Sequence, residues 1–330
     1  MKKILFFLTS SFLGIGLFVW AIKKIGWDQI WETFRDFSIW SIFIILGLSI
    51  LIILIGSRRW QVILKSQGYQ ISFSKVFRAY LIGFSLDYLT PFAMFGGEIV
   101  RGYTIKEDSL DWEKIIASIG IDKILDCIFI FFTIASGLLL FNYRFSSSLI
   151  GSNIILAVSV AIISIILFFY FKIKNKKSAV NVFIRLIGLE KSKSGEAVVK
   201  VENEIFSFFR QKKYFTEIVF LTVLRSAVFI IRHWVLLYLL GISIDVLGTF
   251  SILSFTFLAY LFPLPALLGS HEVIQLFVFP VYGFRSGAGA AFTLILRIGD
   301  LFAAFLGIAF LFHSWSGTLF EFLKRRFKIN

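Results

Sequence analysis

About six apolar stretches of roughly 20 residues recur along the 330-residue chain, and their length limits what it can fold into. A hydrocarbon core about 30 Å thick is crossed by about 20 residues of α-helix. Hydrophobic residues make up 58% of the chain and charged residues only 16%, which excludes an ordinary soluble domain. We predict an all-α polytopic membrane protein that forms a single membrane domain over residues 1–330. The predicted spans lie at about 4–22, 39–58, 114–141, 149–171, 214–237 and 287–312.

Two further apolar stretches, about 73–105 and 246–284, are interrupted by "TPFAMFGGE" and "PLPALLGSHE". Proline removes a backbone hydrogen-bond donor, and glycine loosens a helix. We predict that the first stretch breaks at Pro91 and that the second breaks at Pro263 and Pro265. Each would form a re-entrant hairpin of two half-helices. Unwound backbone at membrane depth must be buried in protein or line a polar cavity, so the first break predicts such a cavity.

An internal repeat relates the two halves of the chain. We predict that repeat one covers about 39–141, that 149–171 is a linking span, and that repeat two covers about 214–312. The extra span would invert the second copy, which is an architecture of transporters. Six chemically matched pairs share one constant difference in residue number, which we call the repeat offset: Arg58 and Arg232, Trp60 and Trp234, Pro91 and Pro265, Glu98 and Glu272, Lys123 and Arg297, and Asp126 and Asp300.

The net charge of +14 is concentrated beside the predicted spans. Residues 172–213 form a basic loop with eleven Lys/Arg against four Glu, and the tail 313–330 contains "KRRFK". Such clusters mark the cytoplasmic side of a membrane and attract anionic lipids. We therefore expect cytoplasmic N- and C-termini in a cell (inner) membrane, and no nucleic-acid partner.

Six charged residues lie within the apolar stretches. Burying each alone would cost about 2.5–3.5 kcal/mol, so we expect them to face the protein interior. The pairs Lys123/Asp126 and Arg297/Asp300 are three residues apart, so the members of each pair can neutralise each other on one helix face. They are interpreted as structural ion pairs that connect a span to its hairpin, with direct ligand contact as the alternative.

Glu98 and Glu272 have no obvious partner nearby in the sequence, so we predict that they contact a lipid head group or exchange protons. Gly96 and Gly97 would let a ligand or a helix approach the backbone closely. Asp87, just before the first break, is either a helix cap or a site residue.

Three arginines are further candidate substrate contacts. Arg101 lies one turn after Glu98 and could pair with it, bind a lipid phosphate or reach the membrane surface. Arg225 and Arg232 are seven residues apart, hence on one helix face, and could line the cavity. Trp60 and Trp234 are predicted to lie at the membrane interface, where indole rings are enriched.

Five motifs resemble those of one known family: "RRWQVILKSQG" at 58–68, "PFAMFGGEIVRGY" at 91–103, "KILD" at 123–126, "PLPALLGSHE" at 263–272 and "RIGD" at 297–300. The family is the flippase-like lysylphosphatidylglycerol synthase transmembrane region, with UPF0104-type integral membrane proteins. The resemblance implies a lipid translocase for phospholipids, aminoacylated phospholipids or polyprenyl-linked lipids. Ala266 and Leu267 depart from the family, which often has glycines at these positions. We also expect the lysyltransferase domain of the bifunctional members to be absent.

We expect a transporter (a flippase or scramblase) rather than an enzyme, with membrane lipids of anionic or zwitterionic head group as partners. The alternatives are a membrane-embedded transferase resembling phosphatidylglycerol lysyltransferase, or a noncatalytic partner of a lipid-modifying enzyme recruited through 172–213. No catalytic residue, metal site or cofactor is predicted, because "HEVIQ" lacks a second histidine and no phosphate-binding glycine loop occurs. The segment 194–215 is predicted to be an amphipathic helix that lies at the inner membrane surface or, alternatively, docks a partner.

Overall fold

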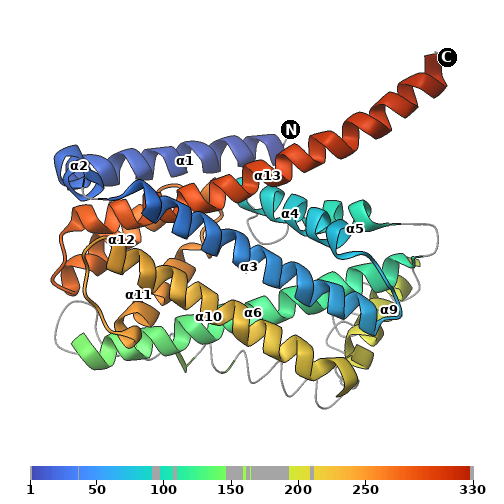
Figure 1. Ribbon diagram of the computed structural model, residues 1–330, viewed down its shortest axis with the longest axis horizontal. Coiled ribbons are helices and arrows are strands. Elements are labelled where there is room, and N and C mark those ends of the chain that lie inside the picture. The colour runs from blue at the N-terminus through green and yellow to red at the C-terminus, as the bar shows by residue number, and fades with distance from the viewer. Residues whose placement is uncertain are drawn as a thin grey trace.

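The computed structural model of the protein describes residues 2–35, 37–90, 97–106, 110–145, 159–160, 164, 193–208 and 212–327. Within these residues the chain is helical and contains no strand (Figure 1). The elements are α1 (Lys2–Ile25), α2 (Trp27–Arg35), α3 (Ile39–Ser66), α4 (Phe73–Leu89), α5 (Glu98–Ile105), α6 (Trp112–Phe145), α9 (Lys193–Phe208), α10 (Lys212–Leu239), α11 (Val246–Ala259), the 3₁₀ turn η1 (Pro265–Leu267), α12 (Ser270–Val281) and α13 (Ser286–Phe327).

Five helices, α1, α3, α6, α10 and α13, are long and apolar enough to cross a membrane. Only 17–44% of the most apolar part of each is buried inside the protein, so the remaining apolar side chains need lipid around them. This confirms the all-α, multi-pass membrane fold. The sixth predicted span, 149–171, lies outside the described residues apart from isolated positions.

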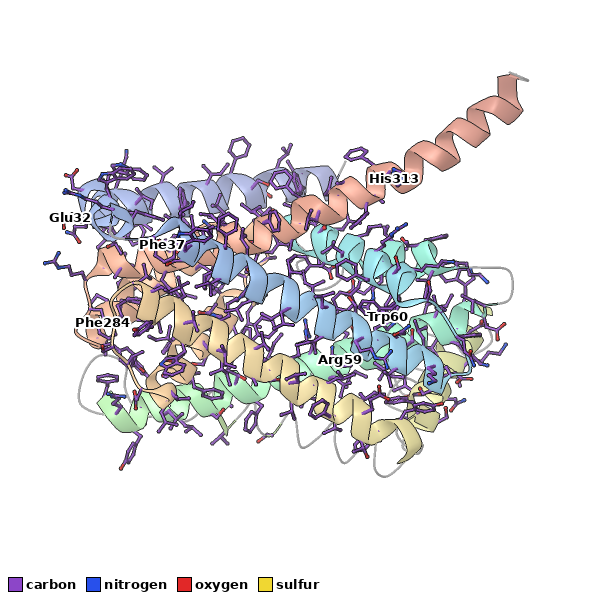
Figure 2. The ribbon with its side chains drawn as sticks, viewed as in Figure 1. Glu32, Phe37, Arg59, Trp60, Phe284 and His313 are labelled. Carbon is purple, nitrogen blue, oxygen red and sulfur yellow. The ribbon has the colours of Figure 1, made fainter. Side chains whose placement is uncertain are left out.

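Helix α2 is a feature that the pattern of spans does not predict. Ile30 is fully buried, whereas Trp27 and Trp31, four residues apart on one face, are each 61% exposed. Exposed tryptophan is typical of the membrane interface. Figure 2 shows Glu32 of α2 at the same end of the molecule as Phe37 and Phe284.

The second interrupted stretch breaks between α11 and α12, and the break contains Pro263 and Pro265 as predicted. Ala266 and Leu267 have positive φ angles of 49° and 54°, and Gly269 follows at 84°. Left-handed backbone suits glycine but strains residues that carry a Cβ atom. The break is therefore held in a conformation that costs energy at Ala266 and Leu267.

Helices α4 and α5 form the first hairpin. Its predicted break at Pro91 lies outside the described residues, and so does Gly96, which is predicted to permit close approach to the backbone. Gly97 lies directly against α4, because a Cβ atom at this position would overlap the Gly83 carbonyl group. Gly97 thus permits the close approach of a neighbouring helix.

The two halves of the chain contain the same series of helices. When the repeat offset is added to the starts of α3, α4, α5 and α6, it gives the starts of α10, α11, α12 and α13 to within two residues. The halves interlock, since α3 packs against α10, α6 against α11, and α4 against α13. Figure 1 shows α3 and α10 running in opposite directions, and the hairpins α4–α5 and α11–α12 toward opposite ends of the molecule.

Helix α9 covers much of the predicted amphipathic segment 194–215. It packs along α6, and its last residue, Phe208, is buried in an apolar cluster that includes Ile121 and Ile218. The predicted helix is confirmed for this part of the segment. Its contact with α6 shows that it forms part of the helical body.

Candidate functional site

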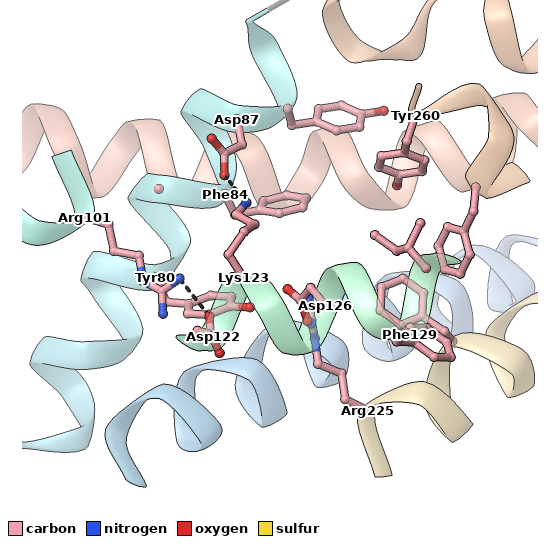
Figure 3. A pocket seen from close by; sticks show the side chains of 15 residues that line it. Tyr80, Phe84, Asp87, Arg101, Asp122, Lys123, Asp126, Phe129, Arg225 and Tyr260 are labelled. Atoms are coloured by element: carbon pink, nitrogen blue, oxygen red, sulfur yellow. Dashed lines mark hydrogen bonds and ion pairs between the residues drawn. The ribbon is translucent and has the colours of Figure 1, made fainter. Parts of the chain in front are cut away.

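A cavity of about 130 Å³ lies among α4, α5, α6, α10 and α11 (Figure 3). It combines charged groups with an aromatic wall, and its helices come from both halves of the chain. The lining residues are Tyr80, Gly83, Phe84, Asp87, Tyr88, Arg101, Asp122, Lys123, Asp126, Phe129, Ile130, Arg225, Phe229, Phe257 and Tyr260.

Lys123, Asp87 and Glu98 form what we call the acidic corner. The Lys123 Nζ atom lies 2.5 Å from Glu98 Oε1 and 3.5 Å from Asp87 Oδ2. Asp87 also accepts a hydrogen bond of 2.6 Å from the Gly97 amide. The three side chains come from α6, α4 and α5, so one ammonium group connects both arms of the first hairpin to a spanning helix.

Three arginines and two aspartates form what we call the basic corner. Arg59 Nη2 lies 2.7 Å from a carboxylate oxygen of Asp122 and 2.7 Å from one of Asp126. Arg101 Nη1 lies 2.9 Å from the other oxygen of Asp122, and Arg225 binds Asp126. The five residues come from α3, α5, α6 and α10, so the basic corner connects the two halves of the chain.

Aromatic rings hold the guanidinium group of Arg101 in place. It lies 3.7 Å from the centre of the Trp60 ring and 4.3 Å from that of Tyr80. Trp60 is fully buried and donates to Ser118 Oγ at 3.0 Å. The predicted role of Trp60 as an interfacial anchor is therefore wrong, because its indole is enclosed in protein and is a partner for a buried cation. Trp234, in contrast, is 46% exposed.

The two corners have opposite residual charges. Formally, the acidic corner contains two carboxylates and one ammonium group, which leaves −1, and the basic corner contains three guanidinium groups and two carboxylates, which leaves +1. Removing an ion from water costs several kcal/mol unless its partners compensate. The balance over all eight groups explains how so many charges remain within a membrane-spanning bundle.

A second charged cluster, which also balances formally, joins α10, α12 and α13. Arg297 Nη1 lies 2.6 Å from Glu272 Oε1, and Arg232 Nη1 lies 2.6 Å from Asp300 Oδ1. Glu272 is fully buried and also accepts a hydrogen bond of 2.9 Å from the Gly269 amide at the second break. This cluster thus connects the second hairpin to α13.

The structure gives the charged residues of the spans partners on other helices. Lys123 on α6 binds Glu98 and Asp87, and Arg297 on α13 binds Glu272. These ions therefore connect α6 and α13, the last span of each half, to the hairpin of the same half. Glu98 and Glu272 have no partner nearby in the sequence, but helix packing brings to each a base that is distant in the chain.

The remaining ionic contacts also differ from the local pairing that the spacing allows. Asp126 binds Arg59 and Arg225, and Asp300 binds Arg232. Of the two arginines on α10, Arg225 lines the cavity, whereas Arg232 lies in the second cluster.

Arg59, Asp122 and Tyr80 are site residues that the sequence patterns missed. The repeat offset favoured Arg58, but Arg58 is half-exposed and binds Glu217 at 3.3 Å, whereas Arg59 is buried. Asp122 precedes Asp126 by four residues in "DKILD", which places both on one helix face. That spacing was the available signal for Asp122.

The additional acids of the cavity have no counterpart in the second half of the chain. The equivalent positions, found by adding the repeat offset, hold leucines, namely Leu261 for Asp87 and Leu296 for Asp122. The second cluster therefore contains fewer charged groups.

Residues 6–307 match the family described as the lysylphosphatidylglycerol synthase TM region. The chain belongs to this family. The match spans both corners and the second cluster, and it confirms the resemblance of the motifs. Membership in the lysylphosphatidylglycerol synthase TM region family identifies a multi-pass integral membrane protein related to lipid metabolism.

Two relatives of this family member are UPF0104 membrane proteins. The chain is 25% identical over 299 residues to one from Methanocaldococcus jannaschii, covering 86% of this chain and 87% of the relative. It is 32% identical over 180 residues to one from Pyrococcus horikoshii, covering 53% of this chain and 52% of the relative.

Proposed function

We propose that the protein is a lipid translocase, which moves a phospholipid, an aminoacylated phospholipid or a polyprenyl-linked lipid between the two leaflets. The supporting observation is the cavity, where six charged side chains of the acidic and basic corners lie beside an aromatic wall. A head group needs polar partners while it crosses the hydrocarbon core, because losing its water without replacement costs several kcal/mol. The charged side chains supply such partners.

The aromatic wall matches the other part of a lipid. Phe84, Phe129, Phe229 and Phe257 line the same cavity as the charged groups. Acyl chains lose little when they leave one apolar environment for another. In this proposal the head group moves along the charged side, and the chains remain against aromatic side chains and lipid.

We further propose that α4–α5 and α11–α12 are re-entrant hairpins of an inverted repeat. The helix starts that share the repeat offset and the opposite directions of α3 and α10 in Figure 1 support this arrangement. Two hairpins that enter from opposite sides provide one movable element for each leaflet, as in transporters built from inverted repeats. The acidic corner and the second cluster would be the contacts that connect each hairpin to its last span.

We propose that the protein lies in the cell (inner) membrane. In this orientation its N- and C-termini face the cytoplasm. The basic residues around Arg58 and those of 172–213 support it, because positive residues accumulate on the cytoplasmic side. Membrane lipids with anionic or zwitterionic head groups are the proposed partners.

Reconstitution tests the proposed function. Purified protein is placed in vesicles that contain fluorescent phosphatidylglycerol, phosphatidylethanolamine or a polyprenyl phosphate, and a membrane-impermeant quencher reports the lipid that reaches the outer leaflet. We expect translocation to fall at least tenfold in Lys123→Gln and in Glu272→Gln. The control Arg285→Gln removes an exposed arginine that binds Glu32 at 3.3 Å, and it should match the unsubstituted protein.

Absence of translocation for every lipid would contradict the proposal. A new chemical product formed in detergent, where no second compartment exists, would instead favour a membrane-embedded transferase. Co-purification with a lipid-modifying enzyme that is lost when the basic residues of 172–213 are neutralised would favour the noncatalytic partner.

A further inference from the structure

We propose that the basic corner is a binding subsite for the phosphodiester of a lipid head group. This inference rests on the proposed function, because it assigns one part of the same cavity to one part of the transported lipid.

Arg101 and Arg225 present hydrogen-bond donors that no described residue accepts. The Nε and Nη2 atoms of Arg101 and the Nε atom of Arg225 have no hydrogen-bond partner within the described part of the chain. Arg101 is only 7% exposed, and both arginines line the cavity. A buried donor without an acceptor costs about 1–3 kcal/mol, so a ligand oxygen at this position is favoured.

The residual charge selects the kind of anion. Arg59, Arg101 and Arg225 exceed Asp122 and Asp126 by one positive charge. A phosphodiester carries one negative charge and neutralises this excess, whereas a diphosphate carries more and would be repelled by the two aspartates. The planar guanidinium fork also suits two phosphate oxygens at once.

The surroundings of Arg101 prepare it for binding. Its guanidinium group lies against the rings of Trp60 and Tyr80, and its Nη1 atom binds Asp122. A side chain already held in one position loses little entropy when a ligand arrives. A Cβ atom at Gly56 would overlap the Tyr80 hydroxyl, so glycine at this position permits the packing that holds Tyr80 beside Arg101.

The acidic corner makes the assignment to the arginines more specific. Lys123 also lines the cavity and could compete for an anion, but it already binds two carboxylates, Glu98 and Asp87. The residual −1 of the acidic corner repels a phosphate. Within the described cavity, the anion is therefore directed to Arg101 and Arg225.

Binding to purified protein in an uncharged detergent tests the subsite. The probes are dihexanoyl phosphatidylglycerol, dihexanoylglycerol as the same lipid without phosphate, inorganic phosphate and farnesyl diphosphate. We expect the phosphodiester lipid to bind at least tenfold more tightly than the other three. Arg101→Gln and Arg225→Gln should each weaken it at least tenfold, and Arg285→Gln should leave it within twofold. If Arg101→Gln does not fold, Arg225→Gln decides the result.

Unchanged binding of the phosphodiester lipid in the folded arginine variants would overturn the subsite. Tighter binding of inorganic phosphate or of farnesyl diphosphate would overturn it as well. Translocation by a protein whose arginine variants bind normally would contradict only the subsite. Arginine-dependent binding by a protein that translocates no lipid would contradict only the proposed function.

Discussion

Lys123 and Glu98 form an ion pair of 2.5 Å, and the equivalent positions of the second repeat form the 2.6 Å pair of Arg297 and Glu272. In both cases a base on a long spanning helix binds an acid in the first turn of the second arm of a hairpin. The repeat offset in the sequence therefore corresponds to a repeated three-dimensional contact. Each pair connects a hairpin to a span at one defined position.

Replacing Lys123 with methionine should destabilise the protein by about 3 kcal/mol, because it leaves the carboxylates of Asp87 and Glu98 facing each other without a cation. Chemical unfolding in detergent measures this change. Adding Glu98→Gln to Lys123→Met should restore at least about 1 kcal/mol, since it removes one of the two unpaired charges.

Lys114 provides the matched control for Lys123. It is more exposed and lies 3.9 Å from Asp111, so Lys114→Met should change stability by about 0.5 kcal/mol or less. If Lys123→Met changed the free energy of unfolding as little as Lys114→Met, the acidic corner would contribute nothing to the stability of the fold.

Replacing Ala266 with glycine should stabilise the protein by about 1 kcal/mol. Ala266 has a φ of 49°, where glycine avoids the clash of a Cβ atom with the backbone. Thermal unfolding in detergent measures the gain. The control Ala303→Gly, in the interior of α13, should have the opposite sign and cost about 1 kcal/mol. A loss of stability in Ala266→Gly would contradict the strain at the second break.

Replacing Gly97 with alanine should destabilise the protein by about 1–3 kcal/mol, because the added methyl group would overlap the Gly83 carbonyl and push α5 away from α4. The matched control is Gly47→Ala, since nothing lies within 4 Å of a Cβ atom built there on α3. That control should gain about 0.5–1 kcal/mol from the higher helix propensity of alanine. Unfolding midpoints that move together for both variants would contradict the contact of α4 with α5.

Asp245 caps helix α11 by accepting a hydrogen bond from the Gly248 amide, and it binds Arg144 at 2.8 Å. The Arg144 guanidinium holds the pKa of this carboxyl below its usual value. Asp245→Ala should cost about 1 kcal/mol at neutral pH through the lost cap. Asp245→Asn should keep most of the cap and lose only the ion pair, which is small at this exposed position.

The pH dependence of Asp245 has a definite sign. A carboxyl with a lower pKa in the folded chain stabilises the fold above the pKa of the unfolded chain, about 3.9, and loses this contribution as the pH falls through the folded-state value. The stability difference between the unsubstituted protein and Asp245→Ala should therefore shrink below about pH 4. A difference that grows on acidification would contradict the ion pair.

The spans and the second break could be predicted because each depends on neighbours in the chain. A run of about 20 apolar residues requires a membrane-spanning helix whatever surrounds it. Pro263 and Pro265 interrupt helical hydrogen bonding wherever they occur. The small helix α2 escaped prediction because its nine residues are too short to span the bilayer.

Sequence alone determined that this chain is a multi-pass helical membrane protein with a repeated set of intramembrane charges. Only the tertiary structure decided how those charges pair. Arg58 and Arg59 are adjacent in the chain, yet successive residues are about 100° apart around a helix, and only Arg59 reaches Asp122 and Asp126. Which side chain meets which partner depends on the rotation and close packing of whole helices, and no local pattern of residues encodes that.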